Sequence, residues 1–178
     1  MPIDDNRTFI YGERRPIVGS VPGEIYPTVQ ETTSIYCIDV FVLRRRPEMQ
    51  VLLGRRVNRP AKGFMWPPGG RKFRNELWGE AAARHLKKDT GLEIAPDRFR
   101  YLDHVLLLFD DRQQEPIEVG TDTPVTQMGL ELTEDEGHLL DTPGELDKLE
   151  WCSIRDILDT ASKFDRCVQR AVTHLLRL

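Results

Sequence analysis

The sequence contains few cysteines, and their spacing excludes two classes of stabilised fold. The 178 residues include three, Cys37, Cys152 and Cys167, and no two of them form a CxxC pattern. An odd number without such spacing indicates neither a disulfide framework nor a zinc site. This usage fits a reducing compartment, so we expect a cytoplasmic location.

The sequence also lacks a long apolar run and an excess of positive charge. The longest strongly apolar run, Val105–Phe109, is far too short to span a bilayer, and the polar residues 1–15 lack the apolar core of a signal peptide. The formal net charge is −4, whereas broad nucleic-acid binding would require a basic surface. We therefore expect neither a membrane nor a nucleic acid as a partner.

What the sequence does contain is a glycine-rich stretch followed by a helical pattern. Two prolines and two glycines at residues 67–70 favour a tight loop. A helix is predicted to follow, with Asn75 as its N-cap and Gly91 as its left-handed stop. Its apolar stripe consists of Leu77, Ala81, Ala82 and Leu86. A glycine loop that enters a helix N-terminus can hold phosphate through backbone N–H groups.

The remaining patterns predict strands on both sides of this helix. The predicted strands are Ser34–Leu43, Met49–Arg56, Phe99–Phe109, Val125–Leu132 and a short one that ends at Trp151. A helix start is predicted at Ser153, and a final amphipathic helix follows from Phe164. This order predicts an α/β fold, an α/β/α sandwich with a mixed β-sheet.

We expect two parts along the chain, an N-terminal extension at residues 1–30 and one domain at residues 31–178. The extension lacks steady periodicity, and only one short strand is predicted in it, near Phe9–Tyr11. Whether it covers a site or builds a homodimer is left open by its sequence.

Asp39 is a lone charge in the middle of a near-continuous apolar strand. A buried carboxylate is costly unless it is paired or faces a wet cavity, which makes Asp39 a functional candidate. The alternative is a structural carboxylate that accepts hydrogen bonds from the backbone or an arginine.

The glycine-rich stretch resembles the Nudix box, G-x5-E-x7-R-E-U-x-E-E-x-G-U, where U is a bulky aliphatic residue. The positions that match are Gly70, Glu76, Arg84, Gly91 and Leu92. Where that pattern has glutamates after its arginine, this chain has His85, Lys88 and Asp89, so the box is degenerate. The preceding segment, Leu52–Arg71, resembles GDP-mannose mannosyl hydrolases, a subfamily whose box is also depleted.

The resemblance implies a site for Mg²⁺ or Mn²⁺ at the two ends of the box. Gly70 resembles the position whose carbonyl ligates the metal, Asp89 resembles a ligating glutamate, and Glu145 matches a glutamine that completes the metal shell. His85 lies one helical turn before Asp89 and could ligate a transition metal, act as a base or be solvated.

The same resemblance implies that arginines bind the diphosphate of the substrate. Arg56, Arg71 and Arg84 match arginines associated with it, and guanidinium groups suit phosphate oxygens. Arg84 has an alternative role, because an ion pair with Glu76 or Glu80 would lock the box instead. Asp39 matches a strand carboxylate placed near the sugar.

The decisive departure from the subfamily is Leu146. It stands where the subfamily has the histidine thought to deprotonate the attacking water, and leucine cannot accept a proton. His138 or Glu145 could take this role instead.

Three functions follow from the resemblance. The favoured one is metal-dependent hydrolysis of a nucleoside diphosphate linked to another moiety, most of all a sugar nucleotide such as GDP-mannose, with release of sugar and GDP. The second is attack at phosphorus, with Asp39, Arg71, Glu145 and His138 as catalytic candidates in either case. The third, which the incomplete box favours, is a Nudix-fold module that binds a nucleotide without cleaving it.

Overall fold

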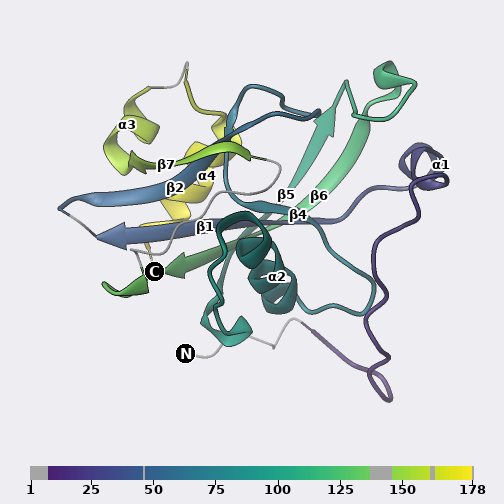
Figure 1. Ribbon diagram of the computed structural model, residues 1–178, viewed down its shortest axis with the longest axis horizontal. Coiled ribbons are helices and arrows are strands. Elements are labelled where there is room, and N and C mark those ends of the chain that lie inside the picture. The colour runs from purple at the N-terminus through teal and green to yellow at the C-terminus, as the bar shows by residue number, and fades with distance from the viewer. Residues whose placement is uncertain (1–7, 46, 137–145, 161–162, 178) are drawn as a thin grey trace.

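A computed structural model describes residues 8–45, 47–136, 146–160 and 163–177, and it contains one β-sheet between two helical layers (Figure 1). The elements in chain order are α1 (Tyr26–Thr32), β1 (Cys37–Arg45), β2 (Met49–Arg56), β3 (Met65–Trp66), β4 (Gly69–Arg71), α2 (Trp78–Thr90), η2 (Pro96–Arg98), β5 (Arg100–Phe109), η3 (Ile117–Val119), β6 (Thr121–Glu131), β7 (Leu146–Ser153), α3 (Ile154–Asp159) and α4 (Arg166–Leu175). Among the described residues, no helix is long and apolar enough to cross a membrane.

The sheet is mixed, as the sequence predicted. Its strand order is β3-β2-β1-β6-β5, with β4 paired to β1 and β7 paired to β2. Strand β1 runs parallel to β6, and the other pairs are antiparallel. The α/β/α sandwich is therefore confirmed.

Strand β1 lies at the centre of the molecule because both of its faces are buried. Ile38, Val40 and Val42 pack with α2 on one side. Phe41 and Leu43 pack on the other side with α3 and α4. Successive side chains of a strand point to opposite faces, so one apolar run contributes to both cores.

Several predicted boundaries are confirmed. Strand β2 has the predicted bounds, and it forms an antiparallel hairpin with β1 in which Arg45 pairs with Met49. Helix α2 ends at Gly91, whose φ of 79° is left-handed and whose N–H donates to the Lys87 carbonyl at 2.8 Å. Only glycine adopts this backbone conformation without strain.

The predicted glycine loop is wrong. Gly69–Arg71 forms strand β4, in which Gly70 pairs with Ile38 of β1. Residues 72–77 then separate β4 from α2, so the glycines do not enter the helix N-terminus. The missed pairing is long-range, and a local loop pattern contains no information about it.

Two further local predictions are wrong. Asn75 does not cap α2, because the N-cap is Leu77, whose N–H donates to Glu80 Oε2 at 2.8 Å. Asn75 instead has a left-handed φ of 66° and donates from its side chain to the Pro16 carbonyl. Phe9–Tyr11 forms no strand, and these side chains are exposed.

Candidate functional site

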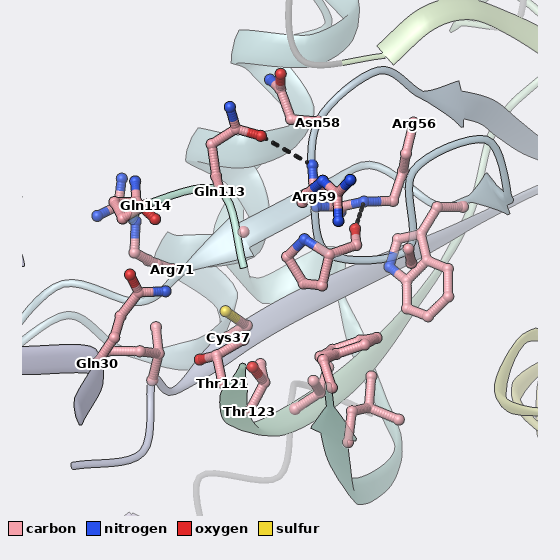
Figure 2. Close-up of a pocket in the computed structure, with 18 of the residues that line it drawn as sticks. Gln30, Cys37, Arg56, Asn58, Arg59, Arg71, Gln113, Gln114, Thr121 and Thr123 are labelled. Carbon is pink, nitrogen blue, oxygen red and sulfur yellow. Dashed lines mark hydrogen bonds between the residues drawn. The ribbon is translucent and has the colours of Figure 1, made fainter. Parts of the chain in front are cut away.

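A cavity of about 190 Å³ opens beside β4, and four of the predicted site residues line it. They are Asp39, Arg56, Gly70 and Arg71. The walls come from β1, β2, β4, β5 and β6, together with α1 and the loops that follow β2 and β5 (Figure 2). Residues far apart in the sequence thus contribute to one pocket.

Asp39 is buried in the wall of this pocket, with 5% of its surface exposed. Burial raises the pKa of its carboxyl to about 7, although the charge of Arg56 and a hydrogen bond from Trp66 act in the opposite direction. A Cβ on Gly69 would lie 2.7 Å from Asp39 Oδ1, so glycine is needed beside this carboxylate. Asp39 can therefore hold a proton near neutral pH.

Arg56 and Arg71 line the pocket, and the guanidinium group of each lies over an aromatic ring. The Arg56 guanidinium carbon lies 5.9 Å from the centroid of Trp66, and its Nε donates to the Pro60 carbonyl at 2.9 Å. The Arg71 guanidinium carbon lies 4.2 Å from the centroid of Tyr26. Guanidinium N–H groups placed in this way can donate hydrogen bonds to the oxygens of a phosphate.

Arg84 faces the protein rather than the pocket. Its Nε and Nη2 donate to the two carboxylate oxygens of Glu76 at 2.6 and 2.9 Å, and Nη2 also donates to the Arg71 carbonyl. Glu76 is 4% exposed, and hydrogen bonds from Arg84 and the Phe73 N–H outweigh the effect of its burial, so its pKa is lowered. The structure thus contains the ion pair with Glu76 that was the alternative prediction for Arg84.

His85 is buried behind β4 and does not line the pocket. Its Nε2 lies 2.9 Å from the Arg71 carbonyl, which assigns the proton to this nitrogen because a carbonyl can only accept. Burial, together with the charge of Arg84, lowers its pKa to about 4, so the imidazole is neutral at pH 7. A Cβ on Gly70 would lie 2.7 Å from His85 Cε1.

Asp89 is also buried behind β4, and its carboxylate contacts the backbone of the glycine pair. Its Oδ2 accepts from the Gly69 N–H at 3.2 Å, and Lys88 Nζ lies 3.7 Å from Oδ1. Asp89 and the Gly70 segment therefore lie together, as the sequence predicted. Among the described residues, no group of three His, Cys, Asp or Glu side chains could hold a metal.

Three residues of the predicted catalytic region cannot be placed in this site. His138 and Glu145 lie outside the described residues. Leu146 begins β7, but its side chain is not described. The identity of a general base stays a prediction.

Four residues of α1 and of the β5–β6 loop line the pocket, and none of them was predicted as a site residue. They are Tyr26, Gln30, Gln113 and Gln114. The loop is positioned by Arg59, whose backbone N–H donates to Gln113 and whose side chain forms an ion pair with Asp111 at 2.8 Å. A carboxamide-rich loop after a long strand was the only sequence signal for this wall.

Comparisons with known proteins indicate a family and a fold. A NUDIX domain family model matches residues 36–172. The low-salt glycan biosynthesis protein Agl8 of Haloferax volcanii is 30% identical over 74 residues, which are 42% of this chain and 46% of that protein. The chain thus matches about half the length of this curated relative.

Two solved structures share the architecture. The MutT protein from Methanosarcina mazei Go1 has a TM-score of 0.61 at 16% identity, covering 81% of this chain and 94% of that chain. The NUDIX domain of Shewanella oneidensis NrtR, solved with ADP ribose, has a TM-score of 0.60 at 14% identity, covering 89% of this chain and 100% of that chain. At these identities the likeness concerns the fold alone.

Proposed function

Because the chain belongs to the NUDIX domain family, we propose that it is a metal-dependent hydrolase of a nucleoside diphosphate linked to another moiety. A sugar nucleotide such as GDP-mannose is the favoured substrate. The observation that carries this proposal is the pocket beside β4, where two arginines and one buried carboxyl line the same cavity.

Arg56 and Arg71 would bind the diphosphate through their guanidinium groups, because aromatic contacts already orient both side chains. Asp39 would contact the other moiety of the substrate. In its protonated form it donates a hydrogen bond to a hydroxyl, and in its ionised form it stabilises positive charge that develops on a sugar.

The chain offers a divalent cation few ligands of its own, which suits Mg²⁺ or Mn²⁺ bound together with phosphate oxygens. Asp89 and the Gly70 carbonyl would hold it, because the Asp89 carboxylate already contacts the backbone of this glycine pair. Glu145 is the further candidate. When bound, the ion neutralises negative charge on the leaving diphosphate.

Two outcomes of hydrolysis are distinguished by their products. Attack at the anomeric carbon gives free sugar and GDP, whereas attack at phosphorus gives a nucleoside monophosphate and a sugar phosphate. Hydrolysis of GDP-mannose in ¹⁸O-labelled water separates them, since the label enters the sugar in the first case and a phosphate in the second.

The second candidate function is a module that binds a nucleotide without hydrolysing it. It is favoured by the positions of His85 and Asp89, which are buried behind β4 and bonded to the Arg71 carbonyl and the Gly69 N–H. These hydrogen bonds support strand β4. Metal-dependent hydrolysis would require at least one of the two side chains to bind the ion instead.

A substrate screen decides between the two. Sugar nucleotides and nucleoside triphosphates are incubated with the full chain and Mg²⁺ or Mn²⁺, and products are separated by chromatography. Turnover that disappears in Asp89→Asn and persists in the exposed control Asp97→Asn supports the hydrolase. Thermal stabilisation by a nucleotide without turnover supports the binding module. The cytoplasmic location, the homodimer and the division at residue 30 stay predictions.

A further inference from the structure

Helix α1 contributes to the pocket although it lies outside the part of the chain that the NUDIX model matches. The match begins at residue 36, whereas α1 spans Tyr26–Thr32. Tyr26 and Gln30 nevertheless line the cavity with the core strands. This helix thus contributes a wall of the pocket from outside the matched segment.

Arg112 fastens α1 to the loop between β5 and β6. This arginine is 0% exposed, and its Nη1 and Nη2 donate to the Pro27 carbonyl at 3.1 Å and to Glu31 Oε1 at 2.7 Å. Its Nε donates within its own loop to the carbonyls of Gln114 and Pro116, at 3.1 and 3.0 Å. Because a buried guanidinium is costly unless it is satisfied, these contacts hold the two walls in one arrangement.

Helix α1 also orients one of the arginines of the pocket. The Arg71 guanidinium carbon lies over the Tyr26 ring, 4.2 Å from the ring centroid. A guanidinium placed in this way can donate its N–H groups to phosphate.

Carboxamides gather at this end of the pocket. Figure 2 shows Gln30, Gln114 and Arg71 together at one end of the view, and Arg56 at the other. A carboxamide offers both a donor and an acceptor, which is what the edge of a nucleobase requires. Among the described residues, Gln30 Oε1 and Thr121 Oγ1 are buried without a hydrogen-bond partner. Because such atoms are rare in folded proteins, this wall is incomplete without a ligand or water.

We propose that α1 and the β5–β6 loop form a nucleobase subsite, read by Gln30 and Gln114 and held in place by Arg112. The inference rests on the proposed function, because it assigns the base of the nucleoside diphosphate to one end of the pocket. The other moiety then lies at the end of Asp39 and Arg56. Tyr26 is a positioning residue for Arg71 in this arrangement.

The experiment is calorimetric titration of the full chain with GDP, ADP, mannose 1-phosphate and inorganic pyrophosphate. Gln30→Ala and Gln114→Ala should each weaken binding of at least one nucleoside diphosphate by about three- to tenfold, the effect of one lost hydrogen bond. Pyrophosphate binding should be unchanged in both variants. Tyr26→Ala should weaken nucleoside diphosphates and pyrophosphate alike, because it acts through Arg71.

One further variant controls for damage to the fold, and another loosens the attachment of α1. Thr28→Ala, the control, alters an exposed residue on the same helix and should change no affinity. Glu31→Gln keeps the shape of the partner of Arg112 while removing its charge. Because α1 contains both Gln30 and Tyr26, this variant should weaken the binding of nucleoside diphosphates and of pyrophosphate alike, with melting temperatures recorded for every variant.

The outcomes separate this inference from the proposed function. Nucleoside diphosphate binding that is undiminished in both glutamine variants overturns the subsite while the hydrolase stands. Weaker binding of mannose 1-phosphate alone would assign this end to the sugar and also overturn the subsite. If the wild-type chain binds none of the four probes and turns over no substrate, both proposals fail.

Discussion

The two sides of β4 use charged residues in different ways. On the pocket side, Asp39, Arg56 and Arg71 surround a cavity. On the side of α2, Glu76 and Arg84 pair with each other, and the buried His85 and Asp89 bond to the backbone of β4. Charged residues of the box thus support the strand, whereas charged residues of β1, β2 and β4 face the pocket.

This division gives His85 a structural role on the side of α2. Its imidazole fills the space over Gly70 and donates to the Arg71 carbonyl, whereas an ionised carboxylate at this position could not donate to a carbonyl. Asp89 stands at the boundary, because it supports Gly69 and is also the carboxylate that we propose for a metal. Variants on the pocket side and on the side of α2 test how strictly binding and support of the strand are separated.

The largest effect on stability is expected from the ion pair on the helix side. Glu76→Ala leaves the Arg84 guanidinium without its carboxylate at a site where Glu76 is 4% exposed. The free energy of unfolding should fall by about 3 kcal/mol, the low end for a broken buried pair, because the remaining Arg84 side chain is 30% exposed. Guanidinium denaturation followed by circular dichroism measures it.

Arg56→Ala is the matched control on the pocket side. Its Nε bonds to the Pro60 carbonyl in a surface loop, so the free energy of unfolding should change by about 1 kcal/mol or less. Pyrophosphate binding should instead be weakened. Equal destabilisation by the two variants would contradict the division between support and recognition.

The second prediction concerns the pH dependence that Asp39 imposes from the pocket side. Its pKa is raised from 3.8 to about 7 in the folded protein. Between these values the folded state binds more protons at Asp39 than the unfolded state does, so the contribution of Asp39 to stability is largest below pH 4 and is lost as pH rises through 7. The contribution lost between pH 5 and pH 8 is about 3 kcal/mol.

Asp39→Asn cannot titrate, so its stability should decline less than that of the wild type over the same interval. Urea denaturation at pH 5 and pH 8 gives the difference for each protein. The exposed Asp97→Asn should follow the wild type. Parallel profiles for wild type and Asp39→Asn would show that this carboxyl is ionised in the fold.

The third prediction tests the contact between Gly70 and His85 across the boundary. Gly70 has a φ of 145°, and a Cβ there would lie 2.7 Å from the imidazole. Gly70→Ala should cost about 2 kcal/mol through overpacking and backbone strain. Adding His85→Ala should recover part of this loss, which a double-mutant cycle detects.

Gly69→Ala serves as the comparison, because its Cβ would lie 2.5 Å from the Ile38 carbonyl oxygen. Backbone cannot give way as a side chain can, so His85→Ala should recover nothing in that variant. Recovery of the same size in both cases would mean that the imidazole does not define the space over Gly70.

The sequence predicted those elements whose signals are local and continuous. Strand β2 and the left-handed end of α2 at Gly91 were predicted because a short apolar run and a glycine stop are signals carried by neighbouring residues. Asp39, Arg56 and Arg71, which line one pocket, were predicted as site residues through the resemblance to GDP-mannose mannosyl hydrolases. All three belong to the shared core of the fold.

The rest depended on contacts between distant segments. Strand β4 exists because β1 offers it an edge, and α1 is held by Arg112, which is 85 residues from its partner Pro27. Asn75 was predicted as a cap from its residue type, but its side chain bonds to Pro16, 59 residues away. The structural propensity of a single residue contains no information about partners so far away in the sequence.

The smallest effect is expected where the N-terminal segment touches the helix side. Arg14 pairs with Glu80 and donates from Nη2 to the Asn75 carbonyl at 2.9 Å. Side chains at this contact are about a third exposed, 33% for Arg14 and 28% for Glu80, so water and salt screen the pair. Arg14→Ala should barely lower the melting temperature and should leave nucleotide affinity unchanged.

Glu31→Gln supplies the contrast within the same N-terminal segment, because α1 faces the pocket whereas Arg14 faces α2. Scanning calorimetry and nucleotide titration of both variants therefore separate two roles of one segment. A drop in melting temperature for Arg14→Ala as large as that for Glu76→Ala would mean that residues 8–25 help to hold the box. In that case the supporting region would extend beyond α2 into the N-terminal segment, and α1 would be its continuation rather than a separate wall of the pocket.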